Sequence, residues 1–247
     1  MLNEKVFEIV AARNALTVSP TLAPELVRDL PDVPVMLETL LQLELTVSER
    51  AIDLAEMSQL VLSDLGASLQ IMRLAGREES FAESRPARIE DCISGLGVQA
   101  CLEAVSRRTF TRSSSHLAIF DIWSHSREIA ESCRSIAEAE FPSIHPDEAY
   151  LVGLFHAIGT LPDVFDWDLA ASLPGDPALA GLKMAEAWAL PGCVLAYFIA
   201  RRAPRANSPW TRIVDHAHQY AGFSLVECSS DDRLPMSKRS ALAVQLV

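Results

Sequence analysis

The sequence predicts an all-α protein with two helical lobes. Its 247 residues include 33 Ala and 32 Leu, whereas aromatic residues make up only 6% and glycines number 10. Ala and Leu have high helix propensity, and β-rich proteins draw instead on Val, Ile, Thr and aromatic residues. Apolar residues also recur at helical spacing in segment after segment, and no segment has the pattern of a convincing strand.

Composition excludes several classes of protein. Asp and Glu number 33 against 21 Lys and Arg, so the formal net charge is −12, whereas nucleic-acid binders present dense positive charge to phosphates. A hydrophobic content of 49% excludes disorder for most of the chain. The longest apolar run, Val194 to Ala200, is too short to span a membrane. Bulk nucleic-acid binding and membrane insertion are therefore not expected.

The cysteines indicate a reducing compartment. Five are present, which is an odd number, and none forms a Cys-x-x-Cys pair. This pattern fits reduced thiols buried as small hydrophobic side chains. Glu4 and Glu8 within the first apolar stretch argue against a signal peptide. We therefore expect a cytoplasmic protein.

Residues 1–29 are expected to form an N-terminal helical extension. Residues 4–14 have the pattern of a short amphipathic helix. Pro20 and Pro24 interrupt the segment that follows, which favours a connector to the main domain.

The main domain is expected to begin near residue 30. Leu-Pro-Asp-Val-Pro at 30–34 precedes a segment with apolar residues at helical spacing. Thr46 and Glu49 have the spacing of a capping box, which predicts a helix start at Thr46. Further helices are predicted over 52–61 and 69–75, the second ended by a glycine cap.

The middle of the chain predicts two short helices and then a break. Residues 77–88 are polar and irregular, as in a loop, and helices are expected over 89–94 and 98–109. The string Arg-Ser-Ser-Ser at 112–115 predicts a boundary between two lobes.

Between those two short helices lies a match to a dinucleotide-binding pattern. Gly95, Gly97 and Ala100 fit Gly-x-Gly-x-x-Ala, but such a site needs a preceding strand and a β-α-β unit. The preceding residues have the pattern of a charged helical turn. The glycines are therefore predicted to shape a turn between helices.

The second half predicts the clearest helices. A long one is expected over 117–139. Pro146, followed by two acidic residues, marks a helix start, and the helix that follows to about residue 158 is apolar all round and therefore central. Later helices are expected over 178–189, 191–202 and 209–221, and residues 222–247 are assigned to a C-terminal tail.

Two histidine-bearing segments resemble the HD-type domain. The segment Asp-Glu-Ala-Tyr-Leu-Val-Gly-Leu-Phe-His-Ala-Ile-Gly at 147–159 is similar to the central helix of that superfamily, whose signature there is His-Asp-Ile-Gly. Trp-Ser-His-Ser at 123–126 lies where the superfamily places its first metal-binding histidine.

The N-terminal half resembles one branch of the superfamily, the HDOD domain, an HD-related output domain of bacterial signalling. The similarity rests on residues 30–34, on Leu-Gln-Ile-Met-Arg-Leu-Ala at 69–75, and on the stretch 89–102 around Gly-Leu-Gly. The resemblance runs over residues 30–221 and implies two helical lobes. Their expected bounds are about 30–115 and 116–221.

The resemblance implies a regulatory or protein-interaction module in signal transduction, without established catalysis and with a signalling protein as partner. Catalytic HD enzymes use adjacent His and Asp to hold a metal that activates water. This chain has Ala157 where that Asp belongs, so we expect no enzyme. One alternative is a metal-dependent phosphohydrolase of HD type acting on nucleotides or cyclic dinucleotides. The sequence does not indicate the identity of the partner or the oligomeric state.

Three histidines occupy or approach the HD-site positions: His125, His156 and His218. His218 aligns best with a further family Asp, and Asp215 lies nearly one turn before it. Three imidazoles can hold zinc if their rings converge. The favoured interpretation is that these residues are vestigial ligands serving as packed polar side chains, with no metal and no cofactor.

An arginine cluster is the second candidate site. No acidic residue lies between Glu186 and Asp215, and this window contains Arg201, Arg202, Arg205 and Arg212. Guanidinium groups bind phosphate or carboxylate through paired hydrogen bonds, so a partner surface or a sensor of a phosphorylated ligand is an alternative function. The simpler interpretation is helix-end charge compensation and solvated surface.

Overall fold

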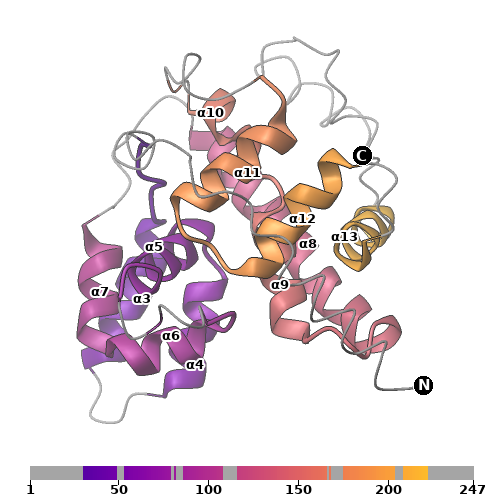
Figure 1. Ribbon diagram of the computed structural model, residues 1–247. Coiled ribbons are helices and arrows are strands. Elements are labelled where there is room, and N and C mark those ends of the chain that lie inside the picture. The colour runs from indigo at the N-terminus through magenta and orange to yellow at the C-terminus, as the bar shows by residue number, and fades with distance from the viewer. Residues whose placement is uncertain are drawn as a thin grey trace. The chain divides into compact units, whose positions relative to one another are not determined.

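The computed structural model describes residues 30–48, 53–78, 81, 86–107, 116–165, 167, 175–203 and 208–221. These residues form helices and contain no β-strand, which confirms the all-α prediction (Figure 1). The predicted helix at 4–14, the boundary at 112–115 and the tail at 222–247 lie outside the described residues. Almost all described residues belong to one compact unit, Pro31–Val247.

The helices fall into two groups along the chain. The first lobe consists of α3 (Leu37–Ser48), α4 (Leu54–Leu62), α5 (Leu65–Ala75), α6 (Ile89–Leu96) and α7 (Val98–Ser106), coloured indigo to magenta in Figure 1. The second lobe consists of α8 (His116–Glu140), α9 (Pro146–Phe155), the 3₁₀ turn η2 (Ile158–Thr160), α10 (Leu161–Val164), α11 (Pro177–Ala187), α12 (Gly192–Arg202) and α13 (Pro209–Tyr220). No helix among the described residues is long and apolar enough to cross a membrane.

Aspartates, rather than the predicted capping box, start α4 and α5 in the first lobe. Thr46 lies inside α3, where its hydroxyl donates to the Gln42 carbonyl, so the predicted start at Thr46 is wrong. The next helix begins after Asp53, whose carboxylate accepts from the backbone amides of Ala55 and Glu56. A threonine hydroxyl satisfied within its own helix does not cap a new one.

The Gly-Leu-Gly segment forms the predicted turn. Gly97 separates α6 from α7 and has φ 84°, a conformation that favours glycine. Helices flank this turn on both sides, so the strand that a dinucleotide site requires is not there.

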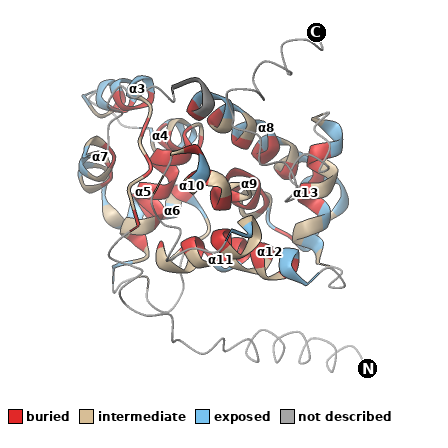
Figure 2. Cartoon of the chain, turned by 90° about the horizontal axis from the view of Figure 1, so that it is seen from above, coloured by how far each residue is buried: buried red, intermediate tan, exposed pale blue. Residues whose placement is uncertain are grey.

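Helix α9 is the centre of the second lobe, as its uniformly apolar sequence predicts. All residues from Ala149 to Phe155 are buried, and α9 is mostly red in Figure 2, whereas α13 also shows exposed residues. Its start is the predicted one, with Pro146 in the first turn and the His145 ring accepting from the Asp147 amide.

A glycine allows α9 and α8 to approach closely. A Cβ atom at Gly153 would lie 2.7 Å from the Ala130 Cα and 2.9 Å from the Cys133 Sγ. Real Cβ atoms do not approach other atoms this closely, so any other residue would separate the two helices.

The end of α9 differs from the prediction. The helix stops at Phe155 rather than near residue 158, and the chain continues through η2 into α10. Beyond Phe155 the Ala157 carbonyl accepts from both the backbone amide and the hydroxyl of Thr160, so a local 3₁₀ pattern replaces the α-helical one. This change of direction leaves His156 at the C-terminal end of α9.

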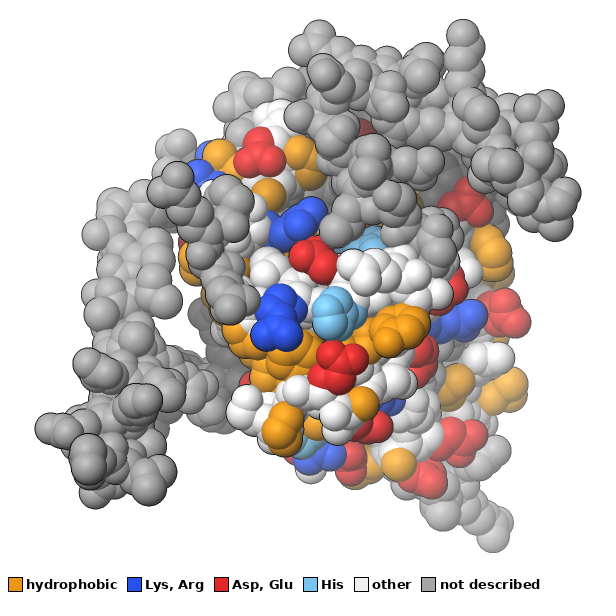
Figure 3. Space-filling model, turned by 90° about the vertical axis from the view of Figure 1, so that its right-hand side faces the viewer, with side chains coloured by type: hydrophobic (Ala, Val, Ile, Leu, Met, Phe, Trp, Pro, Cys, Tyr) orange, Lys and Arg blue, Asp and Glu red, His pale blue; other side chains and the backbone are white. Residues whose placement is uncertain are grey.

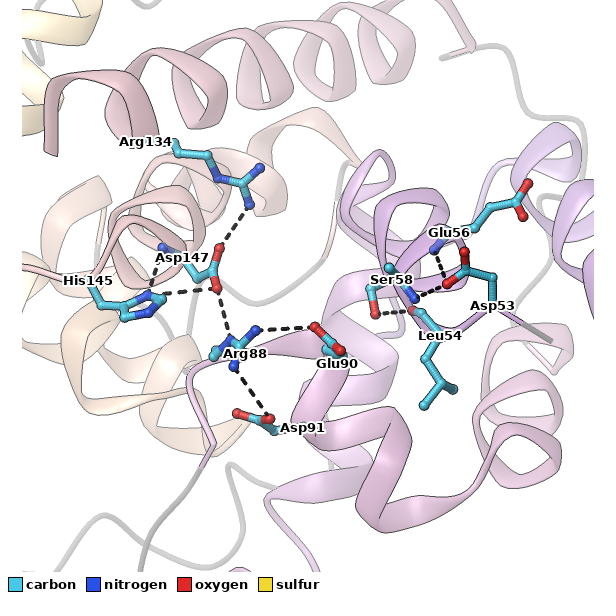
Figure 4. Close-up of polar contacts among 11 residues, drawn as sticks. Asp53, Leu54, Glu56, Ser58, Arg88, Glu90, Asp91, Arg134, His145 and Asp147 are labelled. Atoms are coloured by element: carbon cyan, nitrogen blue, oxygen red, sulfur yellow. Dashed lines mark hydrogen bonds and ion pairs between the residues drawn. The ribbon is translucent and has the colours of Figure 1, made fainter. Parts of the chain in front are cut away.

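Polar contacts join the lobes in the interior and near the surface. Asp64, the N-cap of α5, is 1% exposed and accepts from the Trp123 indole of α8 at 3.0 Å. The Tyr150 hydroxyl of α9 donates to the Leu62 carbonyl of α4 at 3.1 Å. Near the surface, Asp147 binds both Arg88, which precedes α6, and Arg134 of α8 (Figure 4).

Candidate functional site

The three candidate histidines converge. His125 lies on α8, His156 follows the last turn of α9, and His218 lies on α13. Their ring centroids are 4.9 to 5.3 Å apart. Each ring offers one nitrogen, and these nitrogens all lie within 4.8 Å of one another. We call this group the histidine cluster.

The packing of α13 on α8 and α9 selects which of its histidines enters the cluster. His218 is 5% exposed, whereas His216, two positions earlier, faces Glu140 at 3.3 Å. Residues two apart on a helix point to different faces. Figure 3 views the side that carries α13, where histidine, basic and acidic side chains lie close together.

The tautomer of His156 is set by a backbone carbonyl. Its Nδ1 lies 2.6 Å from the Gly153 oxygen. Because a carbonyl oxygen can only accept, Nδ1 carries the proton and donates it. In the neutral ring Nε2 therefore holds a lone pair, which is the form that binds a metal.

Burial keeps the three rings neutral. Desolvation lowers the pKa of His125 and His156, and it lowers the pKa of His218 to about 4. Unfavourable interaction among the charged forms of the rings also lowers the pKa of His156 and His218. At neutral pH the cluster therefore presents unprotonated imidazoles.

Charged groups of both signs surround the cluster. Glu128, one turn after His125 on α8, favours positive charge and raises the pKa of His125. Arg201 of α12 opposes positive charge and lowers the pKa of His156 and His218. Asp215 of α13 partly compensates Arg201, since the two side chains are 3.5 Å apart.

The donor set fits some metals and not others. Among the described residues, the group able to share one ion consists of the three histidines alone. Ala157, next to His156, offers only a methyl group, which cannot bind a metal. Mg²⁺ and Mn²⁺ prefer oxygen ligands, whereas imidazole suits Zn²⁺, Ni²⁺ and Cu²⁺. The residues present therefore fit a borderline ion and do not fit the His-Asp site of the catalytic enzymes.

The arginine cluster does not present a row of open guanidinium groups. Arg201 pairs with Asp215, and Arg212 lies over the Phe141 ring with 5.1 Å between its guanidinium carbon and the ring centroid. Arg202 is exposed at the end of α12, and Arg205 lies outside the described residues. Two of the three described arginines thus already contact partners within the chain.

The polar residues between the lobes were not among the candidates that the sequence pattern indicated. Asp64 precedes the apolar residues of α5, which is an N-cap signal, but its contact with Trp123 spans 59 positions and has no local signature. A cleft of about 290 Å³ lies beside Arg88, Arg134 and Asp147. Asp147 pairs with both arginines, so these three charges already have partners within the chain.

Comparison with solved structures supports the fold. A response regulator, MmoQ, from Methylococcus capsulatus strain Bath has a TM-score of 0.60 at 17% identity, covering 82% of this chain and 93% of its own. A virulence factor from Campylobacter jejuni has a TM-score of 0.55 at 14% identity, covering 79% of this chain and 78% of its own. At these identities the similarity establishes the fold alone. A comparison with curated proteins gave no match.

The family is established by the sequence profile of the HDOD domain. It matches residues 30–164, more than half of the 247 residues. The match includes two of the three clustered histidines, and α11 to α13 follow it. The all-helical architecture is also that of the similar solved structures. The chain therefore belongs to the HDOD domain family.

Proposed function

We propose that this protein is a non-enzymatic regulatory or protein-interaction module in signal transduction, with an HD site that is degenerate for hydrolysis. The observation that carries the proposal is Ala157, which follows His156 where a metal-ligating carboxylate is needed. MmoQ, a protein of similar fold, is a response regulator, which supports a signalling role.

The chemistry of phosphoester hydrolysis explains why Ala157 matters. A catalytic metal centre must hold its ion, bind the phosphate oxygens and activate water, and HD enzymes use a His-Asp pair for this. A methyl group provides neither a ligand nor a base. The nearest acidic group on α13, Asp215, is already paired with Arg201. The cluster thus lacks a carboxylate to complete such a centre.

An activity assay tests the proposal. The full chain is incubated with nucleoside phosphates and cyclic dinucleotides in the presence of Mg²⁺, Mn²⁺ or Zn²⁺, beside a catalytic HD-type phosphohydrolase as positive control. We expect no turnover above the buffer rate. Turnover that is abolished by His125→Ala and retained by His216→Ala would establish the enzyme alternative instead.

The alternative of a phosphorylated-ligand sensor rests on Arg201, which lies near the histidine cluster in the last turn of α12. Calorimetric titration with nucleotides distinguishes it from the proposed function. We expect no saturable heat, because the Arg201 guanidinium is paired with Asp215. Saturable binding lost in an Arg201→Gln/Arg202→Gln double variant would favour the sensor.

A further inference from the structure

We propose that His125, His156 and His218 together bind one Zn²⁺-class ion through imidazole nitrogens alone, and that this ion ties α13 to α8 and α9. The inference goes beyond the proposed function, because a regulatory module needs no metal. It also departs from the expectation that these residues are merely packed polar side chains. The observation behind it is their convergence from three helices.

The spacing of the three imidazole nitrogens is close to the spacing that ligand nitrogens have around a bound zinc ion. Zn–N bonds of about 2.0 Å in a tetrahedral site place the ligand nitrogens about 3.3 Å apart. The nitrogens of the cluster lie within 4.8 Å of one another. Closing the site therefore requires movements of about 1.5 Å or less between nitrogens, which ring rotation can provide. His125 and His156 are of intermediate exposure, and His218 is buried.

The orientation of His156 is already that of a metal ligand. Its Nδ1–H donates to the Gly153 carbonyl at 2.6 Å. In metal sites the ligating histidine almost always donates its other ring N–H to a carbonyl or carboxylate. Gly153 is held between Ala130 and Cys133 of α8. The carbonyl that orients the ring is therefore on a part of α9 that packs tightly against α8.

The donor set selects the kind of ion. Three imidazoles with no carboxylate favour Zn²⁺, Co²⁺, Ni²⁺ or Cu²⁺ over Mg²⁺ and Mn²⁺. The nearby charges nearly balance, because Glu128 favours a cation and Arg201, which opposes it, is paired with Asp215. The surroundings therefore neither supply a hard ligand nor strongly repel the ion.

An ion bound here would link distant parts of the sequence. His156 and His218 are separated by α11, α12 and the segments around them. Helix α13 is the last described helix, and its single buried histidine is the one in the cluster. Metal binding would thus hold this helix on α8 and α9, and metal release would loosen it.

Metal binding is measured on the full chain by equilibrium dialysis against Zn²⁺, with metal and protein quantified in parallel. We expect one ion per chain. Each of His125→Ala, His156→Ala and His218→Ala should weaken Zn²⁺ binding at least about 100-fold. Loss of a residue that only hydrogen-bonds to a metal ligand already lowers metal affinity about 10- to 100-fold. His216→Ala is the matched control, because it removes a histidine from the same helix but another face, and it should bind as the wild type does.

Co²⁺ provides an optical readout of the ligand geometry in the wild type. A tetrahedral three-histidine site predicts intense visible absorption that Zn²⁺ abolishes. A Zn²⁺ concentration about 100 times the dissociation constant should raise the Tm by about 5 to 10 °C for a chain of this size. These two measurements use the wild-type chain and remain decisive if a histidine variant fails to fold.

Selectivity is tested with His218→Asp, which introduces an oxygen ligand. We expect the wild type to prefer Zn²⁺ over Mn²⁺ at least about 100-fold and the variant to reduce that preference at least about tenfold. Wild-type binding of less than one ion per chain would overturn the proposal. So would one tightly bound ion retained by all three cluster variants, which would place it elsewhere.

The Zn²⁺-binding measurement and the activity assay test the metal site and the regulatory function separately. Stoichiometric Zn²⁺ binding without turnover supports both the site and the regulatory function. Turnover with bound Zn²⁺ would overturn the regulatory function and leave the site in place. An absence of both binding and turnover would overturn the site and leave the regulatory function in place.

Discussion

Asp64 should be the most sensitive polar residue between the two lobes. Its carboxylate accepts from the Met36 amide at 2.8 Å, from the Ala67 amide at 3.0 Å and from the Trp123 indole at 3.0 Å. These donors lie before α3, in α5 and in α8. Asp64→Ala would leave all three without their acceptor in the interior.

The magnitude follows from the burial of these donors. An unsatisfied buried donor costs about 1 to 3 kcal/mol, and loss of an N-cap costs about 1 kcal/mol. Burial raises the pKa of Asp64, which means that desolvation of the carboxylate already offsets part of the hydrogen-bond energy. We therefore expect Asp64→Ala to lower the free energy of unfolding by about 3 to 5 kcal/mol rather than by the full sum.

Asp53→Ala is the matched control. Asp53 also caps a helix, but its hydrogen bonds reach only Ala55 and Glu56 and are exposed. We expect a loss of about 1 kcal/mol, measured by urea unfolding with far-UV circular dichroism and tryptophan fluorescence. Equal losses for the two variants would refute the argument that the contacts of Asp64 beyond its own helix stabilise the fold.

Three further outcomes follow from the packing. Gly153→Ala should lower the free energy of unfolding by about 1 to 3 kcal/mol, because its Cβ would overlap α8, and Gly192→Ala, with open space around it, should change it little in the same urea titration. Arg134→Ala should lower the Tm more than Arg88→Ala does, because the Arg134 guanidinium also lies 4.4 Å from the centroid of the Tyr150 ring whereas Arg88 is surface-exposed. Equal decreases in Tm for the two variants would contradict this expectation. The free energy of unfolding should also fall as the pH rises above about 9. Burial raises the pKa of the thiols in the folded chain, so the thiols of the unfolded chain lose their protons at lower pH. The expected decrease is about 1.4 kcal/mol per pH unit for each thiol. The pKa is raised to about 12 for Cys92, Cys133 and Cys193 and to about 11 for Cys101. Urea unfolding at a series of pH values measures this slope, and a Cys133→Ala variant with an unchanged slope would contradict the assignment.

Local sequence patterns predicted most of the helices because their signals lie within a few residues. The proline and acidic residues at the start of α9 and the apolar residues along it predicted a central helix, and Ala149 to Phe155 are buried. The wrong predictions occur where a residue forms a different hydrogen bond from the one that its local pattern predicts. Thr46 bonds within α3 instead of starting a helix, and α9 ends at Phe155, after which Thr160 bonds back to the Ala157 carbonyl in a 3₁₀ turn.

The sequence by itself determined the helical class and the family resemblance, since these depend on residue type and near spacing. Only the tertiary structure decided that His125, His156 and His218 meet and that His216 turns away toward Glu140. The physical reason is that the three rings sit on helices separated by long stretches of chain. Their distances depend on how α13 packs against α8 and α9, and that packing is set by side chains from the whole lobe rather than by any local motif.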